Sequence, residues 1–446
     1  MNAMFKTALL AGAFLGALAS AAAQDEPTID PGQLRIVSPA PVVKAMNATA
    51  AAKARRLGAT ADVSAALAAP LKTFPYTVTS PRDGQSYAGT IVGADPRNNG
   101  ARTTNIELVV IPLRIALTGT VRTWDATVAD PGCLPQGGGA KSALTQFLES
   151  PLVNAVNNLT LNGQNIGNVN FIDGFQRAQF WRTAFGAAPL VQTKPAYHLG
   201  FSPITVKPVQ TITTANNTAG NGASYGFSGA CGTNAASAVN PAARYAAMNI
   251  DFIDAQLQTI IANLGLNSSQ FPLFVSYGMF MTIGAPGNLS GNCCILGYHN
   301  STTGNIANPG QTYGIANYFP NSTAAGLFGS GVTDVATLTH EILEWANDPS
   351  GNNLVPQWGN IGQVGGCQTT GTGSDAGQNN LETGDPLSGS VHPGLTMPNG
   401  VTYFMQENAF FSWFLGDVAF QGAGGKYSSN GSFNGFAKNC PPGGTN

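Results

Sequence analysis

Charged side chains are scarce in this chain, and their scarcity constrains the fold more than any other feature of the sequence. The 446 residues include 22 Asp and Glu and 20 Lys and Arg, or 9%, against roughly 25% in typical soluble domains. Coiled coils, long helices covered with ion pairs and charged disordered tails are thereby excluded. Apolar residues make up 43% of the chain, which is enough for a sizeable core. The sequence therefore predicts a neutral globular protein.

The charge balance also excludes two kinds of partner. The formal net charge is −2, and no run of Lys and Arg offers the basic surface that nucleic acid or an anionic membrane attracts. After the N-terminal segment, no stretch approaches the roughly 18 consecutive apolar residues of a membrane-spanning helix. We therefore expect neither nucleic-acid binding nor a membrane span.

Residues 1–23 have the pattern of a secretory signal peptide. Lys6 supplies a positive charge, Ala8–Ala19 an apolar core, and Ala21–Ala23 small residues at which a signal peptidase could cleave before Gln24. We expect the mature protein to be secreted or periplasmic.

Six cysteines follow the predicted signal peptide. An even number of cysteines in an exported chain favours structural disulfides, and none of their spacings is that of a zinc finger. The adjacent pair is expected to bond to two different partners. The cysteines are Cys133, Cys231, Cys293, Cys294, Cys367 and Cys440.

Beyond the signal peptide, the chain divides into two parts. Residues 24–72 are rich in Ala and form either a pro-segment or an N-terminal packing helix, whereas residues 73–446 form the main domain. In the main domain, hydrophobic periodicity predicts helices and strands in mixed order, which indicates an α+β fold. The predicted helices are 141–158, 173–185, 241–264 and 332–347, and the predicted strands are 103–117, 273–283, 294–299 and 313–319.

The predicted helix 332–347 carries the most informative cluster of ionisable residues. It contains His340, Glu341 and Glu344, and Asp348 follows it, although the whole chain has only four histidines. His340 and Glu344 lie one helical turn apart and can converge on one ion. Negative charge is disfavoured near the C-terminal end of a helix, and this helix contains no Lys or Arg. The pattern therefore predicts a bound cation rather than surface ion pairing.

The motif H-E-x-x-E at 340–344 resembles the active-site helix of zincin metallopeptidases, with Glu in place of the second His. Together with Asp348, Pro349, Trp358 and Cys367, it is similar to a stretch of the plant EXORDIUM (phosphate-induced) secreted proteins and related bacterial exported proteins. Asn360 and Gln363 depart from that pattern, which has acidic residues at these positions.

The resemblance implies a zincin-like α+β fold. In this fold a mixed sheet is accompanied by a long backing helix and an active-site helix, and a loop-rich, disulfide-bonded C-terminal region follows.

The resemblance also implies a metal centre in which His340 and Glu344 hold the ion and Glu341 is the general base. Zinc normally has three protein ligands and one open position, so a third ligand is required. Asp348 is our first candidate, and a site with so many carboxylates could also take calcium or manganese. The other candidates for the third ligand are His299, Glu382, Asp385, His392 and Glu407.

Two functions follow from this reading. The first is a secreted, metal-dependent hydrolase, a zinc metallopeptidase-like protein that acts on a peptide or protein substrate with metal-bound water as the nucleophile. The alternative is a non-catalytic exported cell-surface or wall-associated protein with a structural ion or a glycan-binding role. The acids missing at Asn360 and Gln363 favour the alternative.

Overall fold

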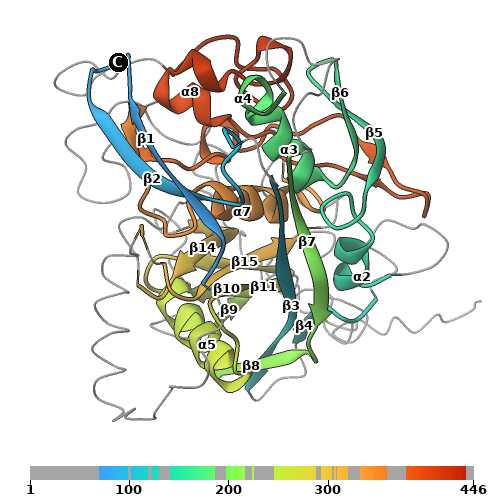
Figure 1. The fold of residues 1–446 in the computed structure, drawn as a ribbon. Coiled ribbons are helices and arrows are strands. Elements are labelled where there is room, and N and C mark those ends of the chain that lie inside the picture. Colours follow the sequence, from blue (N-terminus) through green and yellow to red (C-terminus); the bar gives the residue numbers. More distant parts are fainter. Residues whose placement is uncertain are drawn as a thin grey trace, which may run out of the picture.

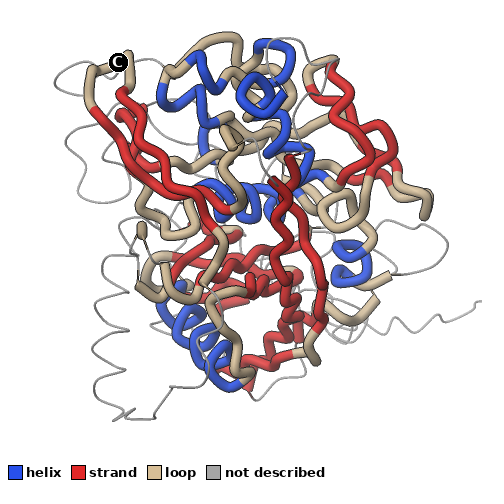
Figure 2. The backbone as a smooth tube through the Cα atoms, in the orientation of Figure 1, coloured by secondary structure: helices blue, strands red, loops and turns tan. Residues whose placement is uncertain are grey.

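The structure, a computed structural model, describes about three fifths of the chain. Of the described residues, 42% lie in strands and 22% in helices, and Figure 2 shows the same imbalance, with short helices among longer strands. The described residues are 70–98, 102–118, 123–129, 141–185, 197–215, 223–225, 246–287, 293–303, 306–307, 309–319, 332–358 and 378–437.

The elements alternate irregularly along the chain (Figure 1). The strands are β1 (Thr73–Thr79), β2 (Ser86–Val92), β3 (Arg102–Thr118), β4 (Thr123–Asp125), β5 (Val156–Leu161), β6 (Gln164–Val169), β7 (Tyr197–Val206), β8 (Gln210–Ala215), β9 (Ala223–Tyr225), β10 (Ala246–Asn249), β11 (Gln270–Tyr277), β12 (Met279–Thr282), β13 (Cys293–Ile295), β14 (Gly297–Ser301), β15 (Thr312–Tyr318), β16 (Leu354–Trp358), β17 (Gln378–Asn380), β18 (Leu395–Thr396) and β19 (Thr402–Tyr403). The helices are α2 (Ala143–Leu148), α3 (Phe171–Gln179), α4 (Trp181–Phe185), α5 (Ile250–Asn263), α7 (Ala336–Asn347) and α8 (Phe411–Leu415), with short 3-10 turns η3 (Asp385–Leu387), η4 (Val418–Phe420) and η5 (Ala423–Gly425).

A seven-stranded mixed sheet built around β3 organises the described residues. β3 pairs in parallel with β11, β7 and β8 and antiparallel with β4, while β15 and β14 extend the sheet beyond β11. Pro112 lies within this central strand, although Pro has no N–H to donate to a sheet ladder. β7 and β8 lie along the same edge of β3, and Pro112 falls in the gap between them, because pairing with β7 ends at Val110 and pairing with β8 begins at Leu113. The missing N–H of Pro112 therefore costs no hydrogen bond along this edge.

The two faces of the main sheet bury different helices. Along β3, Leu108 and Val110 belong to one hydrophobic cluster and Val109 and Ile111 to another, because successive side chains of a strand point to opposite faces. The first cluster includes residues of α7, and the second includes residues of α5. Figure 1 shows α7 across the middle of the molecule, between this sheet and the C-terminal segments around α8.

The predicted α+β fold with a long backing helix is wrong, because strands predominate and the helix predicted over 241–264 is much shorter. Residues 246–249 form β10, which pairs in parallel with β12. The helix α5 begins only after Asn249, whose side chain accepts a hydrogen bond from the Phe252 N–H as an N-cap. Pairing with β12 thus overrides the helix propensity of Ala246 and Ala247. The mixed sheet itself is present.

Other predicted elements are shorter than expected or divided. The helix predicted over 141–158 ends at Leu148, and β5 follows it. The strand predicted over 273–283 divides into β11 and β12 at Gly278, which adopts a positive φ of 64°. The strand predicted over 294–299 likewise divides into β13 and β14, whereas 313–319 matches β15 to within one residue at each end.

Several sequence predictions fall outside the described residues. The signal peptide and residues 24–69 lie there, as do the side chains of all six cysteines, so the part of the chain that is described contains no disulfide. Asn360 and Gln363 also lie outside it. Within the described ranges, no helix is both long and apolar enough to cross a membrane.

Trp345 is expected to anchor α7 to the main sheet. Its ring stacks on Phe271 with 3.8 Å between centroids, and its Nε1 donates to Thr312 Oγ1 at 2.9 Å. We expect Trp345→Ala to lower the free energy of unfolding by about 3–5 kcal/mol, measured by urea denaturation, because it leaves a large cavity. Trp345→Phe, which keeps an aromatic ring, should cost less than half as much. Equal losses in the two variants would contradict this role for the stacked ring.

Candidate metal centre

The helix α7 is enclosed on all sides, so all of its polar side chains are buried. At its N-terminal end Asp334 adopts a positive φ of 34°, and both of its carboxylate oxygens accept from the Phe404 N–H at 3.1 Å. This contact ties the start of the helix to the segment before α8. Val335 occupies the N-cap position and makes no side-chain cap hydrogen bond.

Asp348 closes the C-terminal end of α7. Its carboxylate accepts from the backbone N–H groups of Asn352 and Asn353 at 2.9–3.0 Å and from the Ser350 hydroxyl at 3.4 Å. Burial raises the pKa of Asp348 to about 6, although His299 and these donors oppose the rise. The carboxylate predicted as a third metal ligand is therefore engaged by the turn that follows the helix.

His340 and Glu344 converge as the helical spacing predicts. His340 Nε2 lies 3.1 Å from Glu344 Oε2 and 3.5 Å from Asp385 Oδ1. Asp385, one of the candidates that the sequence offered for the third ligand, belongs to η3. All three side chains are at most 1% exposed. Asp385 thus takes the place beside His340 that Asp348 was expected to fill.

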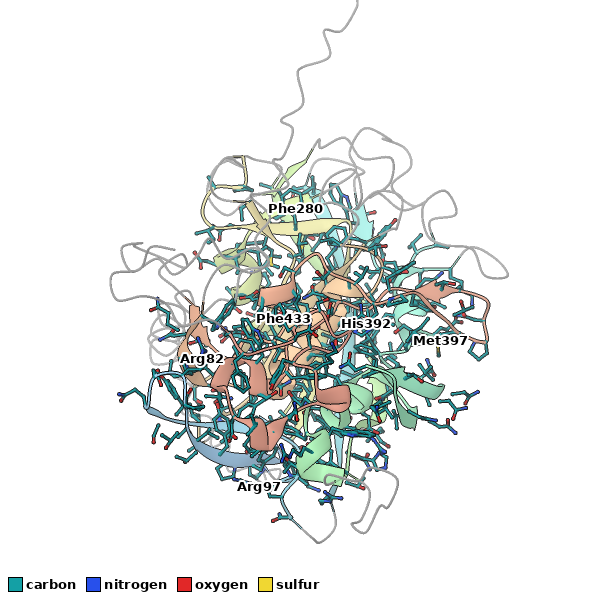
Figure 3. The ribbon with its side chains drawn as sticks, turned by 90° about the horizontal axis from the view of Figure 1, so that it is seen from above. Arg82, Arg97, Phe280, His392, Met397 and Phe433 are labelled. Atoms are coloured by element: carbon teal, nitrogen blue, oxygen red, sulfur yellow. The ribbon has the colours of Figure 1, made fainter. Side chains whose placement is uncertain are left out.

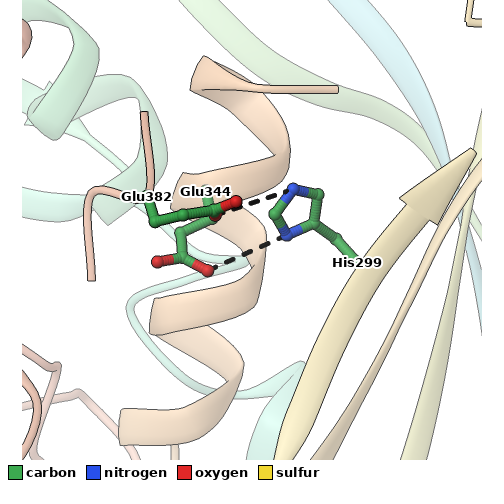
Figure 4. A group of neighbouring side chains, drawn as sticks. All are labelled: His299, Glu344 and Glu382. Atoms are coloured by element: carbon green, nitrogen blue, oxygen red, sulfur yellow. Dashed lines mark ion pairs between the residues drawn. The ribbon is translucent and has the colours of Figure 1, made fainter. Parts of the chain in front are cut away.

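A second histidine enters the same region from β14, the edge strand of the main sheet. His299 Nδ1 lies 3.7 Å from Glu341 Oε2 and 3.8 Å from Glu344 Oε2. Its Nε2 lies 4.0 Å from Glu382 Oε2. Figure 4 shows the carboxylates of Glu344 and Glu382 both facing the His299 ring. His299 is one of the candidates that the sequence offered for the third ligand, and the contact between β14 and α7 brings it to Glu341 and Glu344.

The other two candidates for the third ligand lie elsewhere. His392 Nε2 lies 2.8 Å from Ser429 Oγ, and its ring packs edge-on against Phe171; Figure 3 places it among the C-terminal segments. Glu407 accepts hydrogen bonds from the hydroxyls of Ser428 and Ser432 at 2.6 Å. Both side chains therefore hold the C-terminal loops together.

Neighbouring groups orient the two histidine rings. Gln406 Nε2 donates to Gly384 O at 2.8 Å, and its Oε1 lies 3.1 Å from His340 Nδ1. His299 Nε2 lies 3.0 Å from the carbonyl oxygen of Asp348. His299 Nε2 faces an acceptor and therefore carries a proton. Gln406 offers His340 Nδ1 both an acceptor and, at 3.0 Å, its Nε2 donor, so it fits either tautomer of His340. The other ring nitrogens, His299 Nδ1 and His340 Nε2, face the carboxylates. The sequence contained no signal for Gln406.

Buried donor atoms at this point lack hydrogen-bond partners. His299 Nδ1, His340 Nε2 and Glu341 Oε2 make no hydrogen bond among the described residues, and their contacts are the ion pairs of 3.1–3.8 Å given above. A buried polar atom without a hydrogen bond is costly. Two atoms bonded to one zinc ion at about 2.0–2.2 Å lie at most about 4.3 Å apart. Each distance between a histidine nitrogen and a carboxylate oxygen, 3.1–4.0 Å, satisfies this limit. These buried His and Glu groups could hold a metal ion.

The electrostatics of the cluster favour positive charge. Burial alone would lower the pKa of His340, but Glu344, Glu341 and Asp385 raise it to about 10. Burial alone would raise the pKa of Glu344, yet His340, His299 and the Gly384 N–H bring it below its usual value. The carboxylates thus stabilise a cation beside them, whether it is a proton on a ring or a metal ion.

Two glycines allow the site residues to pack closely. A Cβ on Gly384 would lie 2.4 Å from His340 Nδ1, and one on Gly297 would lie 2.7 Å from Glu341 Cγ and Oε1. Both glycines are therefore required by close approach rather than by their backbone dihedrals. Neither was recognisable among the 55 glycines of the sequence.

The comparisons with known proteins identify no relative. No protein-family model, no curated protein sequence and no solved structure matches this chain.

Gly384→Ala should weaken metal binding by displacing the His340 ring. We expect the affinity for Zn²⁺ to fall at least about 10-fold, as for other losses of ligand orientation, in a competition titration with a chromophoric chelator. Gly435→Ala is the matched control, because a Cβ there meets nothing within 4 Å. Unchanged affinity in Gly384→Ala would contradict a ligand role for His340.

Asp334 should make the protein less stable as the pH rises. Burial raises the pKa of Asp334 to about 7, against the opposing N–H groups of Val335 and Phe404. A raised pKa means that the folded state binds the proton of Asp334 more tightly than the unfolded state does. The stability that this proton contributes is complete below about pH 4 and is lost as the pH rises to about 7. The loss should reach at most about 4 kcal/mol.

Urea unfolding between pH 4.5 and 8 tests this dependence. Asp334→Asn, which does not titrate, should show a smaller loss of stability over this range than the wild type. Asp251→Asn, at an exposed position in α5, is the control and should keep the wild-type slope. Parallel pH profiles for Asp334→Asn and wild type would show that Asp334 does not titrate as proposed.

Proposed function

We propose that this protein is a metal-dependent hydrolase whose ion is held by His340, Glu344 and Asp385. The observation that carries the proposal is the convergence of these donors around His340 Nε2, at 3.1 and 3.5 Å, in a place where that nitrogen has no hydrogen-bond partner. One imidazole and two carboxylates leave a fourth position open for water, which is the ligand pattern of catalytic rather than structural zinc.

The identity of the metal follows from the donor atoms. Zinc accepts both imidazole nitrogen and carboxylate oxygen, and manganese is a second choice for a carboxylate-rich site. Calcium is favoured least, because it prefers an all-oxygen shell of six to eight ligands, whereas two histidine rings face this cluster. We therefore propose zinc.

Glu341 is the proposed general base. A bound zinc ion would supply a Lewis acid that polarises a carbonyl and lowers the pKa of water. Glu341 Oε2 has no hydrogen-bond partner among the described residues and lies 3.7 Å from His299 Nδ1. Oε2 would accept the proton of the attacking water and later deliver it to the leaving group. His299 would hold Glu341 in place, and Gly297 provides the space that its side chain needs.

The peptidase subclass and the location are proposed from the sequence. The H-E-x-x-E motif on α7 resembles zincin peptidases, in which the glutamate next to the first histidine is the base. Residues 1–23 have the pattern of a signal peptide. We accordingly propose an exported enzyme that hydrolyses a peptide or protein substrate.

A second candidate function is a structural metal site in a non-catalytic exported protein. Its supporting observation is burial, because His299, His340, Glu341, Glu344 and Glu382 are all at most 1% exposed. A structural ion needs no access for a substrate, whereas a catalytic ion does.

Glu341→Gln separates the two functions. If the protein is a hydrolase, the variant should keep the wild-type zinc content, measured by mass spectrometry of the purified protein, and lose at least about 100-fold in casein hydrolysis. Glu107→Gln is the matched control, because Glu107 lies on β3 and contacts Thr205 and Gln270. It should leave both zinc content and activity unchanged.

Two other results would decide against the proposal. Wild-type protein that contains zinc but cleaves neither casein nor gelatin would support the structural role. Wild-type protein that binds no divalent metal would exclude both functions.

A further inference from the structure

The face of α7 that carries the candidate metal centre has a fourth polar side chain, which the proposed function does not use. Thr337, His340, Glu341 and Glu344 follow the spacing i, i+3, i+4 and i+7, so they lie along one face of the helix. We call these four residues the site face of α7. Thr337 is 1% exposed, and residues at this spacing have Cβ atoms about 5–6 Å apart. Thr337 therefore lies one helical turn before His340 and Glu341.

The hydroxyl of Thr337 makes no hydrogen bond among the described residues. A threonine inside a helix can bond back to the carbonyl oxygen four residues earlier. Thr339 does so, because its Oγ1 donates to Val335 O at 2.8 Å. The two threonines are equally buried in one helix, yet only the one away from the site face is paired.

The position of this unpaired hydroxyl indicates what it binds. A buried polar group without a partner is costly, and in a native structure it points to a group that it binds in the working protein. Thr337 is next to Glu341, the proposed general base, on the same face of the helix. A group that meets Thr337 there also lies beside the centre at which hydrolysis is proposed.

The hydroxyl supplies a hydrogen-bond donor that the site face otherwise lacks. Glu341 and Glu344 carry carboxylates, which only accept hydrogen bonds when they are ionised. His340 Nε2 faces the carboxylates of Glu344 and Asp385. A peptide brings backbone carbonyl oxygens into the site, and each of them needs a donor when it leaves water. Thr337 Oγ1 is the neutral donor that this face can offer to such an oxygen.

We propose that the Thr337 hydroxyl donates a hydrogen bond to a backbone carbonyl oxygen of the peptide substrate. This inference rests on the proposed function, because it assigns a contact to the substrate of that reaction. The hydroxyl has no bond to give up in the free protein, so the new hydrogen bond contributes directly to substrate binding. A donor that is already fixed in place needs no reorganisation when the substrate arrives.

Thr337→Val removes the hydroxyl and keeps the branched shape of the side chain. We expect kcat/KM for fluorescently labelled casein to fall about 5- to 10-fold, as for the loss of one hydrogen bond, while the zinc content stays at the wild-type value. The midpoint of urea unfolding should stay unchanged or rise, because the hydroxyl is unpaired in the free protein. Thr337→Ser keeps the hydroxyl and should retain most of the wild-type kcat/KM.

Thr339→Val is the matched control and should show the opposite pattern. Its hydroxyl is bonded to Val335 O and lies away from the site face. The substitution should therefore lower the midpoint of urea unfolding and leave kcat/KM unchanged.

Three results would contradict the contact. An unchanged kcat/KM in Thr337→Val would overturn it and leave the hydrolase proposal standing. A urea midpoint that falls as far in Thr337→Val as in Thr339→Val would also overturn it, because the hydroxyl would then have a partner in the free protein. A wild-type protein that hydrolyses no casein would overturn both the contact and the proposed function.

Discussion

The burial of α7 is the constraint on which the rest of the structure depends. The helix packs against β14 and β15 on one side and against the C-terminal segments on the other, so its polar side chains cannot reach bulk water. An unpaired buried polar group is costly, so most of them contact other groups of the protein. Thr339 bonds back to Val335 O, and Asn347 to Leu343 O. His340, Glu341 and Glu344 instead meet other ionisable groups.

The elements around α7 supply those groups from distant parts of the chain. β14 contributes His299, the segment after β17 contributes Glu382 and Asp385, and the segment before α8 contributes Gln406. The ends of the helix are held by Asp334 and Asp348, which bind backbone N–H groups. The acids on and around α7 thus serve in two ways, as helix-end contacts and as donors in the cluster. This division explains why Asp348, close to the motif in sequence, does not join the cluster.

Sequence patterns located the elements better than they determined their lengths. β3, β15 and α7 lie where hydrophobic periodicity placed them. The apolar residues that form the pattern in each element are buried in the hydrophobic clusters. The prediction of a helix over 241–264 is wrong at residues 246–249, which form β10 and pair with β12. Single-sequence patterns cannot reveal such pairing, because the partner strand lies in another part of the chain.

The sequence by itself determined that His340 and Glu344 face each other, because helical geometry alone sets that spacing. Charge scarcity also indicated that the acids around them are not ordinary surface residues. Only the tertiary structure decided which other donors join them. It selected His299, Glu382 and Asp385 over Asp348, His392 and Glu407. The physical reason is that strand pairing and loop packing set these contacts, and neither is encoded in local spacing.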